Sequence, residues 1–165
     1  MLIGILSDTH SNYAIVKRVR RVLDERQVNE ILHCGDIEDA ETVHMLDGLS
    51  AQFVLGNCDL DTPELRQSIK DIGAVLHDGF GHIEPDGCHV AWIHGHEQGR
   101  FRDLVDAQHF EFVFYGHTHR QEQHRIGKTE VINPGALYRA RDKSFAILDT
   151  QSRQVEIVVV EQHKT

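Results

Sequence analysis

Five short apolar runs of the chain are each followed by a residue that can bind a metal ion, and this feature constrains the fold most. The runs cover residues 2–7, 30–35, 53–56, 90–93 and 112–116, and the side chains that follow them are Asp8, His10, Asp36, Asn57, His94, His117 and His119. In an open α/β sheet, the carboxyl ends of parallel strands gather at one edge, and ligands bind there. We therefore expect the fold to bring these seven residues together.

Local spacing supports this gathering. Residues two apart in an extended chain point the same way, so Asp8 with His10 and His117 with His119 can each present two ligands together. Four glycines stand beside the presumed ligands, at Gly35, Gly56, Gly95 and Gly116. Because they lack a side chain, they allow a sharp turn and leave room for a bulky group.

The first half of the chain alternates strands with amphipathic helices. We predict strands over residues 2–7, 30–34 and 52–55, and helices over residues 12–26, 40–49 and 64–72. Pro63 suits the first turn of the third helix. Such alternation is typical of a parallel sheet with crossover helices.

After residue 74 the pattern changes to closely spaced strands. Residues 85–87 predict a hairpin turn, residues 101–107 a short helix, and residues 79–84, 88–93, 111–115, 121–126, 130–132, 144–148 and 155–160 strands. The two halves together predict an α/β fold of the four-layer type, an α/β/β/α sandwich of two mixed sheets flanked by helices. Since no linker or repeat divides the chain, we expect one domain over residues 1–165.

Charge and composition narrow the function classes. A formal net charge of −9 disfavours a nucleic-acid platform, because an acidic surface repels a polyanion. No apolar stretch approaches the ~20 residues of a membrane span, and the apolar opening reaches Asp8 too soon for a signal peptide. We expect a cytoplasmic protein without a membrane partner.

Histidine is in excess, with 13 residues in a chain of 165, and this favours a metal-binding protein. The 3 cysteines, Cys34, Cys58 and Cys88, show no CxxC spacing. They are typical of reduced thiols and not of a disulfide framework or a zinc knuckle.

Five short motifs follow one another along the chain: Asp8-Thr9-His10, Gly35-Asp36, Gly56-Asn57-Cys58-Asp59, His94-Gly95-His96 and Gly116-His117-Thr118-His119. Through them the sequence resembles the calcineurin-like metallophosphoesterases. Asn133-Pro134-Gly135 is similar to a further segment of the small prokaryotic phosphodiesterase branch, and the resemblance suggests that its backbone lines the cavity. One such motif is unspecific, whereas the ordered set is highly specific.

The resemblance implies two groups of metal ligands. One cation would be held by Asp8, His10, Asp36 and His119, and the other by Asp36, Asn57, His94 and His117. The resemblance thus implies that Asp36 is the bridge, and the chemistry agrees, because a carboxylate can span two metals whereas a neutral imidazole or an amide oxygen binds one. Mixed nitrogen and oxygen ligands suit transition metals better than Ca²⁺. Following the resemblance, we expect two divalent ions, Mn²⁺ first, with Fe, Zn²⁺ or Ni²⁺ as alternatives.

The predicted activity is metal-dependent hydrolysis of small phosphate esters, foremost diesters. Two divalent cations, less the charges of two carboxylates and a bridging hydroxide, leave the centre positive and attractive to phosphate. The hydroxide attacks phosphorus while both ions neutralise the developing charge. We place Asp36 and Asn57 at the reacting centre, and His96 as donor of a proton to the leaving alkoxide.

The third motif departs from many larger relatives, which carry histidine where this chain has Cys58. We interpret Cys58 as a mark of the small branch and do not transfer the catalytic role to it. Asn57, Cys58 and Asp59 are together expected near the substrate phosphate or behind the ligands. Asp59 either orients a ligand or caps the turn over residues 60–62. Arg120 is interpreted as a solvated loop arginine, with a phosphate contact as the alternative.

The competing function is a non-catalytic protein-interaction scaffold of the same fold, as in the retromer subunit, with a degraded metal site. A metal-binding regulator without catalysis is a third possibility. Here every ligand position is filled, which favours the enzyme. The natural substrate stays open, and a homo-oligomer is one option for the assembly. The histidines outside the motifs are interpreted as structural, namely His33, His44, His77, His82, His89, His109, His124 and His163.

Overall fold

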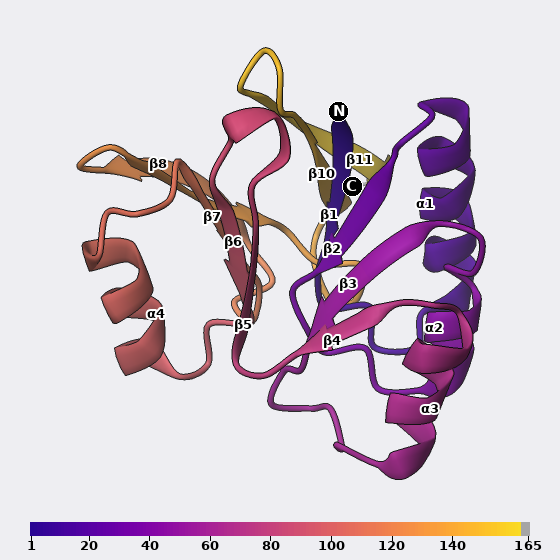
Figure 1. Ribbon diagram of the computed structural model, residues 1–165. Helices are drawn as coiled ribbons and strands as arrows, with labels where there is room; N and C mark the ends of the chain where they lie inside the picture. Colours follow the sequence, from indigo (N-terminus) through magenta and orange to yellow (C-terminus); the bar gives the residue numbers. More distant parts are fainter. Residues whose placement is uncertain (163–165) are drawn as a thin grey trace.

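The computed structural model describes residues 1–162, so His163 and the last residues of the predicted domain lie outside the described part of the chain. Two β-sheets lie face to face, and helices cover their outer surfaces on both sides (Figure 1). The order of layers is helix, sheet, sheet, helix. The predicted α/β/β/α sandwich of two mixed sheets is therefore confirmed.

The first sheet holds most of the amino-terminal half. Its six strands lie in the order β11 (Gln154–Glu161), β10 (Lys143–Asp149), β1 (Leu2–Leu6), β2 (Glu30–His33), β3 (Ser50–Val54) and β4 (Val75–His77). Strands β1 to β4 are parallel, whereas β10 pairs antiparallel with both β1 and β11. The outer face is covered by α1 (Tyr13–Glu25), α2 (Ala40–His44) and α3 (Pro63–Asp71) (Figure 1).

The second sheet has five strands and a single covering helix. Its order is β5 (Phe80–Ile83), β6 (Val90–Ile93), β7 (Phe112–Tyr115), β9 (Thr129–Pro134) and β8 (Gln121–Ile126), and α4 (Gln98–Asp106) covers its outer face (Figure 1). Strands β6, β7 and β9 are parallel, while β5 and β8 pair antiparallel at the two edges. No helix in residues 1–162 has the length and apolar character needed to cross a membrane.

Apolar side chains fill each space between the layers. Ile3 and Ile5 of β1 pack with Trp92 and Phe114 of the second sheet, and all four are fully buried. Leu6 instead packs under the helices of the first sheet. Each such side chain contributes about 1.5–3 kcal/mol on burial. Because both faces of the central strands are covered, these strands read as continuous apolar runs.

Three predicted elements differ from the structure. Helix α2 ends at His44 and not at residue 49, because the following turns include Gly48 with a φ of 81°, which a right-handed helix excludes. Helix α4 begins at Gln98, three residues before the predicted start. Strand β9 ends at Pro134, two residues after the predicted end, and Pro134 lies opposite Gln121.

Candidate metal centre

The loops that follow five strands meet at one edge of the two sheets, as the strand-end pattern predicted. Backbone hydrogen bonds tie the first two together: the N–H of Asp8 donates to the carbonyl of Gly35, and that of His10 to the carbonyl of Asp36. The N–H of His117, from the second sheet, donates to the Asp8 carboxylate at 3.1 Å. The two sheets therefore contact each other directly at this edge.

Four of the predicted residues form one close group, Asp8, His10, Asp36 and His119, whose ligand atoms all lie within 4.8 Å of one another. His119 Nε2 lies 3.2 Å from Asp8 Oδ1. His10 Nε2 lies 3.4 Å from Asp36 Oδ2 and 3.4 Å from His119 Nε2. These are the spacings of atoms that can surround a single cation.

The remaining three residues lie on the other side of Asp36. His94 Nε2 lies 3.0 Å from Asn57 Oδ1 and 3.4 Å from Asp36 Oδ2. The ring of His117 packs edge-on against His94, with centroids 5.2 Å apart. Asp36 Oδ2 thus lies 3.4 Å from Nε2 of both His94 and His10, so its carboxylate contacts a histidine of each group.

The hydrogen bonds of two histidines fix which ring nitrogen faces the centre. His94 Nδ1 lies 2.9 Å from the carbonyl of Cys34, and His10 Nδ1 lies 2.7 Å from Glu38 Oε1. In the neutral ring, an Nδ1–H that donates to these acceptors leaves a lone pair on Nε2. Those lone pairs point at carboxylate and amide oxygens, which are also acceptors. Acceptors that converge on acceptors need a cation between them, so the residues fit a metal.

The pKa values of the group reflect the same crowding of opposite charges. Burial by itself raises the pKa of Asp36, but the hydrogen bond and charge of His94 and the N–H of Cys58 lower it well below its usual value. Burial lowers the pKa of His94, yet Asp36 outweighs this and raises it. The hydrogen bond to Asp8 raises the pKa of His119. The carboxylates therefore favour a positive charge beside both imidazoles, which either a proton on the ring or a bound cation can supply.

Asp59 organises the loop that carries Asp36. Its carboxylate accepts hydrogen bonds from the N–H groups of Asp36, Ile37, Glu38 and Gly56, at 2.7–2.8 Å. The turn over residues 60–62 takes no hydrogen bond from it, and α3 is capped by the side chain of Thr62. The hydrogen bonds of this carboxylate thus support the loop that carries Asp36, and orientation of that ligand stays a prediction.

A buried chain of hydrogen bonds, which the sequence did not reveal, supports the same loop. The N–H of Gly35 donates to His33 Nδ1 at 3.1 Å, so the His33 Nε2–H faces Thr9 Oγ1 at 3.1 Å. Thr9 Oγ1 in turn donates to the carbonyl of Asp36. Burial lowers the pKa of His33 to about 4, which keeps the ring neutral in this chain. His33 carries no sequence motif, so nothing distinguished it from other structural histidines.

Two glycines allow the ligand loops to pack closely, because Gly56 lies against Asp36 and Gly116 lies against Ser7 and Asp8. A Cβ at Gly56 would lie 2.1 Å from Asp36 Oδ1, and one at Gly116 would lie 1.8 Å from Ser7 Oγ and 2.6 Å from Asp8 Oδ2. Neither position has room for a methyl group. The backbone near the centre is also strained, because Asp8, Asp36 and His117 all have positive φ values.

A cavity of about 380 Å³ opens over the centre, lined by His10, Asp36, Glu38, Asn57, Cys58, His117, His119, Tyr138 and Arg139. Residues 133–135 are absent from this lining, contrary to expectation. Instead, the Asn133 side chain donates to the carbonyl of Gly116 and to Thr118 Oγ1, and so braces the loop after β7. Glu38, Tyr138 and Arg139 lie in loops without periodic pattern, and the sequence did not single them out.

Two predicted residues lie at the margin of the centre. Cys58 is exposed as a residue. Partial desolvation of its thiol and the charge of Asp36 raise the pKa of that thiol to about 11, which favours the neutral form. His96 is also exposed; its ring centroid lies 5.3 Å from that of His94 and 6.3 Å from that of His117. His96 therefore stands beside the ligand group without belonging to it.

Known proteins share this sequence pattern. Residues 1–153 match the calcineurin-like phosphoesterase superfamily domain. A phosphodiesterase of Methanocaldococcus jannaschii is 29% identical over 166 residues, which span 98% of this chain and 100% of the relative.

Solved structures share the fold. A structure described as a novel archaeal phosphodiesterase superposes with a TM-score of 0.89 at 27% identity, covering 96% of this chain and 99% of the other. Vps29 of Chaetomium thermophilum superposes with a TM-score of 0.72 at 15% identity, covering 96% and 95% of the two chains. This second likeness concerns the fold alone, so the side chains of the site must carry any argument about chemistry.

Proposed function

The chain belongs to the calcineurin-like phosphoesterase superfamily and is a hydrolase of phosphate esters, and from this premise we propose that it is a phosphodiesterase with a dinuclear metal centre. Asp8, His10, Asp36 and His119 would hold one divalent cation. Asp36, Asn57, His94 and His117 would hold the other. The Methanocaldococcus jannaschii relative, whose match covers 98% of this chain, is named a phosphodiesterase, which supports the choice of diesters.

One observation carries this proposal: the carboxylate of Asp36 contacts a histidine of each group, with Oδ2 3.4 Å from Nε2 of both His10 and His94. A carboxylate is the one ligand type here that can serve two cations at once. The alternative of a non-catalytic scaffold is disfavoured, because each position of both groups carries a side chain able to bind a metal.

The residues of this chain do most of the preparation for the reaction. Asp59, His33 and Thr9 hold the Asp36 loop before a substrate arrives. When bound, two divalent cations supply a hydroxide at neutral pH and neutralise charge on the phosphate oxygens. The cavity of about 380 Å³ admits a small phosphate ester over the ligand atoms.

We assign the proton donor for the leaving alkoxide to His96, which is exposed beside His94 and His117. His96→Ala should slow an alkyl ester far more than an ester that leaves as nitrophenolate, which needs no proton. The exposed His109, remote from the motifs, gives a control in His109→Ala. Equal losses on both substrates would refute the assignment.

The decisive experiment combines metal analysis with kinetics. The purified protein should contain two equivalents of divalent metal and hydrolyse bis-p-nitrophenyl phosphate in preference to p-nitrophenyl phosphate, with added Mn²⁺ raising the rate. Asp36→Asn should lose metal and activity together, whereas Asp103→Asn on the exposed face of α4 should keep both. Full rate and full metal content in Asp36→Asn would disprove the bridging role. Absence of hydrolysis with every metal tested would favour the scaffold.

Several finer properties are proposed from the sequence. Mixed nitrogen and oxygen ligands suit Mn²⁺, Fe, Zn²⁺ and Ni²⁺ alike, and manganese is the first choice because of the resemblance to the family. We also propose a cytoplasmic location, which cell fractionation tests, and a single domain over residues 1–165, which limited proteolysis tests. A homo-oligomer is one option for the assembly, and light scattering tests it.

A further inference from the structure

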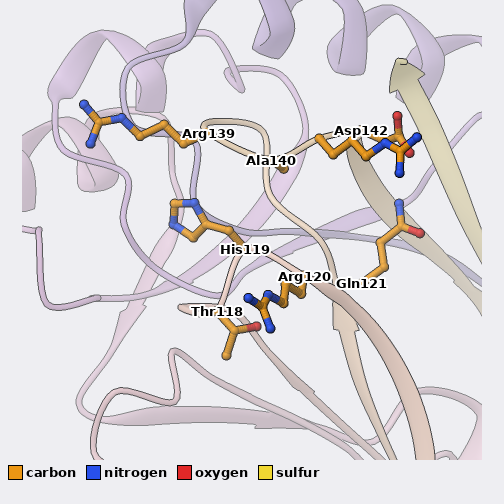
Figure 2. Close-up of a pocket in the computed structure, with 8 residues that line it drawn as sticks. Thr118, His119, Arg120, Gln121, Arg139, Ala140 and Asp142 are labelled. Atoms are coloured by element: carbon orange, nitrogen blue, oxygen red, sulfur yellow. The ribbon is translucent and has the colours of Figure 1, made fainter. Parts of the chain in front are cut away.

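Three arginines line a second cavity next to the metal centre. The cavity has a volume of about 500 Å³ and is lined by Thr118, His119, Arg120, Gln121, Arg139, Ala140, Arg141 and Asp142. In Figure 2 the imidazole of His119 lies between the side chains of Arg139 and Arg120, with Gln121 and Asp142 at the other end. We call this space the arginine cavity.

The arginine cavity adjoins the metal centre through two residues. His119 and Arg139 line both the arginine cavity and the cavity over the ligand atoms. Arg139 has a φ of 48°, and its guanidinium lies 5.1 Å from the centre of the Tyr138 ring, which also lines the metal-centre cavity. A molecule held over the ligands can therefore extend past Arg139 into the arginine cavity.

All three arginines of the lining are exposed, so their guanidinium groups are accessible to a ligand. Within residues 1–162, neither Arg120, Arg139 nor Arg141 takes part in an ion pair, although other arginines of the chain do. Three like charges around one space repel one another, and a single carboxylate, Asp142, shares the lining. This cationic lining occurs on a chain of net charge −9. A guanidinium binds phosphate through paired N–H donors, so a phosphate would satisfy these groups.

We propose that the arginine cavity binds a second phosphoryl group of the substrate, so that the preferred substrates are phosphate esters that carry another phosphate. The proposal rests on the proposed function, because it takes the reacting phosphate to lie at the metal centre. Arg120 is then not the solvated loop arginine of the sequence interpretation but a residue that determines specificity.

Non-hydrolysable ligands test this directly. Isothermal titration calorimetry of the Mn²⁺-loaded full chain would compare α,ω-alkane bisphosphonates of increasing length with the alkyl monophosphonate of the same length. At the length that spans both cavities, the bisphosphonate should bind about 10-fold more tightly, which exceeds the statistical advantage of carrying two phosphonates. Arg120→Gln and Arg141→Gln should each remove most of that gain, and the corresponding lysine variants should retain part of it.

Arg21→Gln is the matched control, because Arg21 is exposed on α1 and lines neither cavity. No preference for the bisphosphonate at any length, or a preference that survives both substitutions, would overturn the proposal. Hydrolysis of bis-p-nitrophenyl phosphate reports separately on the proposed function. Hydrolysis without a bisphosphonate preference rejects only the arginine cavity, whereas a preference without hydrolysis rejects only the phosphodiesterase.

Discussion

The two sheets contribute to the centre in different ways. The loops after β1 and β2, which we call the carboxylate side, bring Asp8, His10 and Asp36, and the two carboxylates are 0% and 2% exposed. The loops after β6 and β7, the imidazole side, bring His94, His117 and His119, of which only His94 is buried. One side is held in the interior, and the other opens to the cavity.

The difference follows from charge. A buried carboxylate is costly unless hydrogen bonds and opposite charges surround it, so the carboxylate side requires a dense support. Asp59 and the chain from His33 through Thr9 provide that support. A neutral imidazole that is partly exposed carries no buried charge, so it needs fewer supporting hydrogen bonds. The carboxylate side therefore sets the geometry of the centre, and the imidazole side leaves the approach open for substrate.

The largest effect on activity should come from substituting one proposed ligand on each side. Asp8→Asn places an NH₂ group where the Asp8 carboxylate accepts the Ser7 hydroxyl and the His117 N–H, so we expect kcat/KM to fall about 10²–10³-fold. His117→Gln changes an exposed ring and should cost about 10–100-fold. Both are measured with bis-p-nitrophenyl phosphate at saturating Mn²⁺, with exposed His124→Gln as control. A larger loss for His117→Gln would break the comparison.

The second effect is on stability at acid pH. The pKa of His33 is near 6.5 in the unfolded chain, and burial lowers this pKa to about 4 in the folded chain. The unfolded state therefore gains protons first, and the folded state loses about 3 kcal/mol of stability as pH falls across that window. Urea unfolding at pH 7 and pH 5 should show a smaller loss in His33→Gln than in the parent, with both proteins free of metal. Equal losses would contradict a neutral, buried His33.

The third effect concerns the support of the Asp36 loop. Asp59→Asn replaces one of two oxygens that accept four N–H groups, so we expect the affinity for Mn²⁺ to fall about 10–100-fold. Asp61→Asn is the control, because Asp61 only pairs with Arg66 on the surface. Metal titration followed by calorimetry measures both variants. An unchanged affinity in Asp59→Asn would mean that the loop keeps its geometry without this carboxylate.

The smallest effect should come from Glu38, which orients His10 on the carboxylate side. Glu38→Gln keeps an oxygen that can accept from His10 Nδ1, so the affinity for Mn²⁺ should fall less than about 10-fold. On the imidazole side, the backbone carbonyl of Cys34 orients His94 by accepting from its Nδ1. A side-chain substitution cannot remove this acceptor. A loss as large as that of Asp59→Asn would show that the charge of Glu38, and not only its geometry, matters.

The sequence predicts the gathering of ligands better than their support. Strand ends in a parallel sheet share an edge, and this rule is enough to group Asp8 with Asp36 in the first sheet. His94 follows β6 of the second sheet, so its approach to Asp36 depends also on how the two sheets pack. The roles of Asp59 and His33 depend on where backbone N–H groups point in loops with positive φ values, and no periodic pattern encodes that. The sequence did not predict the arginine cavity for a related reason, since Arg139 and Arg141 lie in an irregular segment before β10.

The contact between Asp8 and the backbone of His117 has a consequence for synthesis of the protein. Residue 8 leaves the ribosome more than 100 residues before residue 117, and amino-terminal segments begin to fold first. Until the segment after β7 is made, two of the seven proposed ligands, His117 and His119, are absent from the chain. The proposed metal centre therefore cannot be complete before residue 119 of 165 has been synthesised.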